Sequence, residues 1–390
     1  MKFSRAERAH VADWWLSVDR TLLTLILTLA VAGLAASLIA SPSVGIHLTG
    51  DPFYFVKRQA AGMVFALAVV FAVSLLSPSQ MKRLALLLFA GGAILMVVAL
   101  AQGAERNGAT RWLILAGAVV QPSEFVKPGF VVLTAWLFAE SVKRPDMPAI
   151  ELSLLMLAVF LSLLIFQPDV GQAIIAASVW CGMLFLAGYS LRLLPAFLML
   201  GAGGLTAAYF TMPHFTSRLN RFLQGAGESL QTSVAVNAFR DAGWLGHGLG
   251  EGFTKSRLPD AHNDFVFAAI AEETGIAACL FLILIYALIV WRVLRRAFRE
   301  EDAFVRLAAA GLVMIFGLQA LINMAVNLNL LPAKGVTLPF ISYGRSSLIA
   351  SAITLGMVAG LTRRPASRLA SHALQPLGGL TMTSGEGGQL

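Results

Sequence analysis

The chain has 390 residues, of which 57% are hydrophobic and 13% charged, and its formal net charge is +8. Soluble domains carry about 25% charged residues, so the composition excludes a soluble protein and places most of the chain in lipid. The positive charge does not indicate a nucleic-acid-binding protein, because basic residues of membrane proteins collect on cytoplasmic loops. Cys181 and Cys279 both fall in apolar runs, so we expect no disulfide framework.

Ten apolar runs follow a polar segment at residues 1–20, and each is long enough, or nearly so, to cross a hydrocarbon core of about 30 Å. The fold class expected is an all-α polytopic membrane protein with about ten transmembrane helices. The first run lacks a convincing cleavage site, which favours a retained signal anchor. The runs are residues 21–40, 57–76, 82–101, 122–140, 150–166, 171–188, 192–211, 265–292, 304–326 and 341–361.

The distribution of lysine and arginine predicts the orientation. Most of these residues fall in the terminal segments and in the loops on the same side, so the positive-inside rule places both termini in the cytoplasm. We expect a cytoplasmic segment at 1–20, a membrane domain at 21–365, and a disordered cytoplasmic tail at 366–390 that is rich in Gly, Ser and Thr.

One loop, residues 212–264, is far larger than the others and is expected on the outer side. It has too little apolar content for a core of its own, and runs such as 231–239 are typical of short amphipathic helices in the headgroup region. The glycine-rich turn at 243–252 could bring backbone amides against phosphate oxygens, and a flexible connector is equally compatible with it. It lacks the strand-to-helix setting of a nucleotide-binding loop.

The loop ends in His262, Asn263 and Asp264, which pass directly into a long apolar run. This predicts a carboxylate at the first turn of a span, where free helix amides stabilise it and reduced hydration raises its proton affinity toward that of a useful base. Asp and Asn are also common helix caps, and on local sequence alone capping is favoured over catalysis.

Glu124 and Lys127 are spaced i,i+3 at the start of another span, so they can pair on one helix face. An ionisable pair there is costly unless it faces a protein interior or a wet cleft; we expect it in the site, the alternative being a pair that merely neutralises itself. Asp169, which precedes the sixth apolar run, is expected to cap that helix.

Residues 330–347 contain two prolines, two glycines and several hydroxyls, which predicts irregular backbone lining a cavity. Lys334 and Arg345 are candidates for contacting an anion, whereas Asn323 and Asn327 are interpreted as interhelical hydrogen-bonding residues. His247 and His262 belong to no ligand-spaced cluster, so a structural zinc site is not expected. All these polar groups share one membrane side, which indicates a site for an amphiphile with an anionic head.

Four stretches and one dipeptide resemble, in order, the signatures of the SEDS family (shape, elongation, division and sporulation) over about residues 14–365. Two departures from the family pattern are Asn263, where Thr is usual, and Arg345, where Gly is usual. The stretches are QPSEFVK at 121–127, QPDVG at 167–171, LPDAHNDF at 258–265 and LPFISYGRSS at 338–347, with Arg111-Trp112 before the first.

The resemblance implies a peptidoglycan glycosyltransferase that polymerises lipid II at the outer face of the bacterial cytoplasmic membrane. It also implies a class B penicillin-binding protein and other divisome proteins as partners, with no nucleic acid. Residues 332–339 look more like the cell-division members, which act at the division site, than the elongation members. A lipid II flippase, an elongation-type polymerase and a structural scaffold are the rival functions; no inverted repeat that would favour a transporter is visible.

The family's catalytic aspartate maps onto Asp264, which would take a proton from the attacking sugar hydroxyl while positive charge stabilises the departing diphosphate. Inversion at the anomeric carbon is expected by analogy with glycosidases, and a covalent role for Asp264 stays open. A divalent cation, Mg or Mn, is a further candidate. Asp169, Gln167 and Asn263 are expected to support the site. The candidates for contacting substrate or diphosphate are Lys127, Glu124, Arg111, Lys334, Ser342, Arg345 and His262.

Overall fold

The structure is a computed structural model. The chain divides into one compact unit, Arg20–Thr362, and a second unit made of Met1–Asp19 and Arg363–Leu390. Arg20–Thr362 contains all the helices and strands named here, and the tail expected at 366–390 lies outside the described residues. The structure describes residues 13–102, 104–106, 109–115, 117–144, 146–190, 192, 194–224, 230–252, 262–332 and 335–363.

Each of the ten predicted apolar runs forms a helix, which confirms an all-α polytopic membrane protein. Seven of these helices are long and apolar enough to cross a membrane, and α8, α9 and α15 are shorter apolar helices. Their bounds are α2 Arg20–Ala40, α4 Tyr54–Ser74, α5 Pro78–Gln102, α6 Pro122–Lys143, α7 Ala149–Phe166, α8 Val170–Leu186, α9 Leu194–Thr211, α13 Val266–Ala297, α14 Ala303–Asn327 and α15 Arg345–Leu361.

Shorter elements occupy the connections between these helices. Helix α11 (Leu230–Asp241) covers the amphipathic run predicted at 231–239, and α10 (Pro213–Gln224) precedes it. Helix α3 (Pro42–Thr49) and an antiparallel three-stranded sheet between α5 and α6 were not predicted. The sheet has the order β1-β2-β3, with strands Ala104–Arg106, Ala109–Leu115 and Ala118–Val120.

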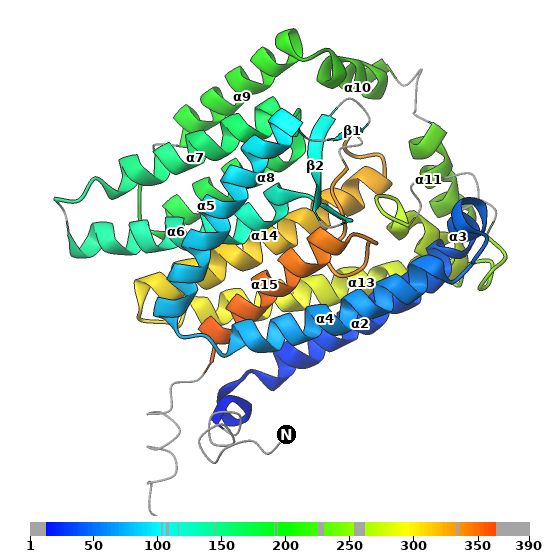
Figure 1. Cartoon of the computed structure of the whole chain (residues 1–390), viewed down its shortest axis with the longest axis horizontal. Coiled ribbons are helices and arrows are strands. Elements are labelled where there is room, and N and C mark those ends of the chain that lie inside the picture. Colours follow the sequence, from blue (N-terminus) through cyan, green and yellow to red (C-terminus); the bar gives the residue numbers. More distant parts are fainter. Residues whose placement is uncertain are drawn as a thin grey trace, which may run out of the picture. The chain divides into compact units, whose positions relative to one another are not determined.

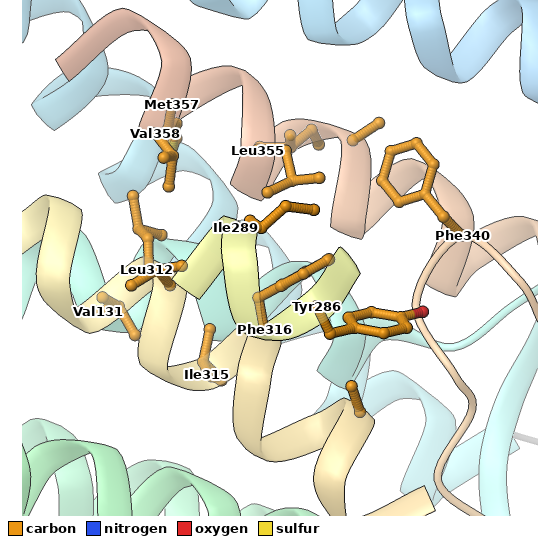
Figure 2. Packing of buried hydrophobic residues seen from close by; sticks show 14 of the residues in the cluster. Val131, Tyr286, Ile289, Leu312, Ile315, Phe316, Phe340, Leu355, Met357 and Val358 are labelled. Atoms are coloured by element: carbon orange, nitrogen blue, oxygen red, sulfur yellow. The ribbon is translucent and has the colours of Figure 1, made fainter. Parts of the chain in front are cut away.

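Helix α6 is buried on almost every side, because α5, α7, α8, α14 and α15 pack around it. Helix α13 packs against α14 and α2, and α15 lies along α4 (Figure 1). Apolar side chains from α6, α13, α14 and α15 meet in the core (Figure 2). There the Tyr286 hydroxyl donates to the carbonyl of Pro339 at 2.5 Å, which ties the non-helical segment before α15 to α13.

Helix α13 is interrupted at Gly275, where φ is 82° and ψ is 175°. The glycine-rich turn at 243–252 supplies hydrogen bonds at this break: the amides of His247 and Gly248 donate to the carbonyls of Glu272 and Glu273 at 2.9 and 3.1 Å. The expectation that this turn offers its amides to phosphate, or is merely a flexible connector, is therefore wrong for these two amides. They bind α13.

Candidate functional site

Asp264 lies two residues before the first residue of α13, and so just outside the helical turn in which the sequence placed it. The N-cap residue is Phe265, whose side chain makes no cap hydrogen bond. The Asp264 carbonyl accepts two side-chain hydrogen bonds from α14, from Asn323 Nδ2 at 3.1 Å and Asn327 Nδ2 at 2.9 Å. Two amides on a neighbouring helix therefore hold the main chain at Asp264.

The segment 335–344 lies against Asp264, and its backbone is non-helical, as predicted. A Cβ atom on Gly335 would lie 3.7 Å from Asp264 Oδ2, and Asn323 Nδ2 also donates to the carbonyl of Val336 at 2.6 Å. The Tyr343 amide donates to the carbonyl of His262 at 2.9 Å. Residues 262–264 and 335–344 are thus joined twice, directly between His262 and Tyr343 and through Asn323 between Asp264 and Val336.

His262 and Asn263 differ in their surroundings. The His262 ring is 4.9 Å from the ring of Phe55, at the start of α4, and 5.6 Å from that of Tyr343. Asn263 is half-buried, and its buried Oδ1 accepts no hydrogen bond from the described residues. The departure from the family pattern at Asn263 therefore leaves a polar atom whose hydrogen-bonding capacity is unused in this part of the chain.

Glu124 and Lys127 form the predicted ion pair, with Lys127 Nζ 2.9 Å from Glu124 Oε1 and each residue only 3% exposed. Lys127 Nζ also donates to Gln172 Oε1 at 3.1 Å and to Gln319 Oε1 at 2.9 Å. An ammonium has three N–H donors, so all three are used. The adjoining hollow, lined by both charged residues, is about 260 Å³ even with its solvent-open space, which is below the usual size of a ligand site.

A chain of hydrogen bonds continues from this pair to Thr337 in the segment 335–344. Gln319 Nε2 donates to the carbonyl and hydroxyl oxygens of Thr337, both at 3.4 Å, and Thr337 Oγ1 lies 2.6 Å from Ser347 Oγ. Gln319, Asn323 and Asn327 follow one another at intervals of four along α14, so they share one helix face. No site role was predicted for these three residues or for Gln172. Carboxamides repeated every four residues in an apolar helix could have identified the three on α14.

Arg111 lies on β2 and is buried against the turn at residues 167–169. Its Nε donates to the carbonyl of Gln167 at 2.9 Å, its guanidinium also donates to the carbonyl of Pro168, and Nη1 lies 3.6 Å from Asp169 Oδ2. Asp169 caps α8, as expected, by accepting from the Gln172 amide at 3.4 Å. Burial raises the pKa of Asp169 although the Arg111 charge opposes the shift. The structure therefore places Arg111 with Gln167 and Asp169.

The remaining candidates fall near the start of α15. Ser342 Oγ accepts from the Leu338 amide at 2.8 Å and closes a buried turn. Arg345 is the first residue of α15, is exposed, and makes no hydrogen bond or ion pair with the described residues. Lys334 lies outside the described residues. Within the described ranges, no three His, Cys, Asp or Glu side chains come together as metal ligands.

Comparisons with known proteins agree over nearly the whole chain. Residues 20–366 match the FtsW, RodA and SpoVE model, described as cell cycle protein. The chain is 37% identical over 364 residues to a Caulobacter vibrioides protein, covering 93% of each. It is also 37% identical over 356 residues to an Alcanivorax borkumensis protein, covering 87% of this chain and 92% of that relative. Both relatives carry the name Probable peptidoglycan glycosyltransferase FtsW.

Solved structures show the same arrangement of helices. A chain of a peptidoglycan synthase complex that coordinates polymerization and crosslinking matches with a TM-score of 0.74 at 27% identity, covering 89% of this chain and 98% of that one. Thermus thermophilus rod shape determining protein RodA matches with a TM-score of 0.66 at 26% identity, covering 89% of this chain and 97% of that one.

Proposed function

The chain belongs to the FtsW, RodA and SpoVE family of cell cycle proteins, and on that basis we propose that it is a peptidoglycan glycosyltransferase. Its substrate is lipid II, which it polymerises into glycan strands for septal wall synthesis at the outer face of the cytoplasmic membrane. A class B penicillin-binding protein and other divisome proteins are its partners. The cell-division role is supported by the names of the 37%-identical relatives.

The observation that carries the proposal is the setting of Asp264. Its carbonyl is fixed by two α14 amides, and its carboxylate lies beside Gly335. The same face of α14 carries Gln319, which binds Lys127 of the buried Glu124–Lys127 pair. A general base has to be held within hydrogen-bond reach of the proton it removes. An acid on a fixed main chain, beside irregular backbone, supports the assignment of Asp264 as that base.

In the proposed reaction Asp264 takes the proton of the acceptor sugar hydroxyl while that oxygen attacks the anomeric carbon of the donor. The new glycosidic C–O bond forms as the bond from that carbon to the diphosphate oxygen breaks. The electron pair leaves with the lipid diphosphate, and attack from the opposite face inverts the anomeric carbon.

The basic residues that could stabilise the departing diphosphate differ in whether their donors are already used by other protein groups. Arg345 is exposed and uncommitted among the described residues, so we propose that it contacts the anion directly, with Lys334 as a second candidate. Lys127 acts through its charge, because a direct contact would require Gln172 or Gln319 to give up its hydrogen bond. Glu124 pairs with Lys127, Ser342 and His262 hold the segment 335–344, and Arg111 holds the turn at residues 167–169.

The test uses the purified chain with its class B penicillin-binding protein in proteoliposomes, with glycan synthesis and lipid II flipping measured separately. We expect glycan from the wild-type chain and at least a roughly 100-fold lower rate from Asp264→Asn, with an unchanged thermal unfolding midpoint. Full activity in Asp264→Asn would remove the base assignment. Flipping without polymer would identify a transporter, and neither activity would leave a scaffold.

A further inference from the structure

The side chain of Asn327 occupies the place of a helical hydrogen bond. In an uninterrupted helix the Ala268 amide would donate to the Asp264 carbonyl. Here the Ala268 amide donates to Asn327 Oδ1 at 3.1 Å and to the carbonyl of Phe265 at 3.1 Å, while Asn327 Nδ2 donates to the Asp264 carbonyl at 2.9 Å. The carboxamide stands between the two groups, and α13 therefore begins after Asp264.

Asn323, one helical turn before Asn327 on α14, links the backbone at Asp264 to the backbone at Val336. Its Nδ2 donates to the carbonyls of both Asp264, at 3.1 Å, and Val336, at 2.6 Å. Asn327 Nδ2 in turn donates to the Asn323 carbonyl at 2.9 Å. One amide nitrogen thus sets the separation between the main chain carrying Asp264 and the segment that faces its carboxylate.

These contacts are more specific than interhelical adhesion. Asn323 and Asn327 are 1% and 0% exposed, and burying a carboxamide is unfavourable unless its hydrogen bonds are satisfied. Both side chains direct an N–H to one carbonyl, that of Asp264. Adhesion between helices does not require this convergence.

We propose that Asn323 and Asn327 are positioning residues for Asp264, an inference that rests on the function proposed above. They keep Asp264 out of α13 and at a fixed distance from residues 335–336. Without the Asn327 carboxamide, the Asp264 carbonyl can accept from Ala268, so α13 gains a residue and the carboxylate moves with its backbone. A displacement of about 1 Å costs on the order of 100-fold in rate.

The test compares wild type, Asn323→Leu, Asn327→Leu and Asn327→Asp with the control Gln59→Met. The Leu variants keep a similar volume, and Asn327→Asp keeps the acceptor for Ala268 but loses the donor to Asp264. Gln59 is a buried carboxamide on α4 whose Nε2 makes no hydrogen bond with the described residues. Lipid II binding stoichiometry gives the number of folded sites, so the glycan synthesis rate is expressed per binding site.

We expect the rate per site to fall about 10- to 100-fold in the three Asn variants, with lipid II affinity within about twofold of wild type and the control unchanged. A merely structural role would lower the number of sites and leave the rate per site at the wild-type value, which would overturn the inference. The same assay contains wild type and Asp264→Asn: if wild type makes no glycan, or Asp264→Asn is fully active, the proposed function fails instead.

Discussion

Gly246 and Gly275 meet backbone to backbone: a Cβ atom on Gly275 would lie 2.3 Å from the carbonyl oxygen of Trp244 and 2.6 Å from the amide of Gly246. A Cβ atom on Gly246 would lie 2.3 Å from the carbonyl of Glu273. Both residues also have positive φ, at 75° and 82°. The glycine-rich turn at 243–252 and the break in α13 therefore depend on each other.

We predict that Gly246→Ala and Gly275→Ala each destabilise the fold by at least about 2 kcal/mol, because backbone clash adds to the strain of a left-handed conformation. The thermal unfolding midpoint in detergent measures this. Gly203→Ala in α9 is the control: its Cβ would meet open space, so the midpoint should stay the same or rise. Equal midpoints in all variants would show that the close backbone contact between Gly246 and Gly275 does not stabilise the fold.

The buried Glu124–Lys127 pair should show strong coupling. Lys127→Met leaves a buried carboxylate without its cation and should cost roughly 3 kcal/mol of unfolding free energy. The double variant Glu124→Gln with Lys127→Met removes both charges and should recover most of that stability, yet stay slow in glycan synthesis because the positive charge is gone.

The exposed pair Lys57–Asp51, also with a 2.9 Å separation, provides the comparison. Lys57→Met should cost far less stability than Lys127→Met, since exposed ion pairs contribute little. Additive effects of Glu124→Gln and Lys127→Met in a thermal-unfolding cycle would contradict the prediction of coupling.

Arg345 should matter for substrate affinity more than for stability. A cation at the first turn of a helix opposes the helix dipole, so Arg345→Gln should leave stability unchanged or raise it by up to about 1 kcal/mol. We expect KM for lipid II to rise about threefold or more, through loss of a charge-assisted contact, with kcat little changed. The control is Lys143→Gln, which removes a cation at the C-terminal end of α6. An unchanged KM in Arg345→Gln would remove Arg345 from the site.

Asp169 should impose a pH dependence on stability. Because burial raises the pKa of this carboxyl, the folded chain keeps the proton at pH values where the unfolded chain has lost it. Stability therefore falls as pH rises from about 4 through the raised pKa. Asp169→Asn can still cap α8, so its unfolding midpoint should vary less with pH over this interval.

Asp51 supplies a control of opposite sign. Its hydrogen bond with Lys57 lowers its pKa, so its contribution to stability is present at neutral pH and is lost as pH falls through the lowered pKa. Asp51→Asn should reduce only that acid-side loss. An Asp169→Asn midpoint that followed the wild-type pH dependence would show that this carboxyl does not titrate as inferred.

The helices and the ion pair could be predicted, because both depend on residues that are close together in the sequence. Apolar runs of span length indicate helices, and i,i+3 spacing brings Glu124 and Lys127 to one face. The run predicted from residue 265 begins within one residue of α13. What fixes that start could not be predicted: Asn327, 59 residues from Ala268, takes the amide that would otherwise extend the helix. The break at Gly275 depends in the same way on a distant turn.

Arg111 shows a second limit of the sequence. An arginine beside an outer membrane surface indicates an anion site, but its actual acceptors are carbonyls 56 and 57 residues away. The sequence alone cannot tell whether a guanidinium donates its hydrogen bonds to the protein's own backbone or to a ligand. Arg345, in contrast, is exposed, as the prediction of an anion contact requires.

The burial of α6 has a consequence for how the chain enters the bilayer during synthesis. Lys127 receives Gln172 as an acceptor 45 residues later, but Gln319 is made 192 residues later. At about 5–20 residues per second, translation of that stretch takes roughly 10 to 40 s. Over this interval the ammonium lacks its last acceptor, so α6 cannot settle among lipid tails when it leaves the translocon, and the centre of the bundle is completed only when α14 arrives.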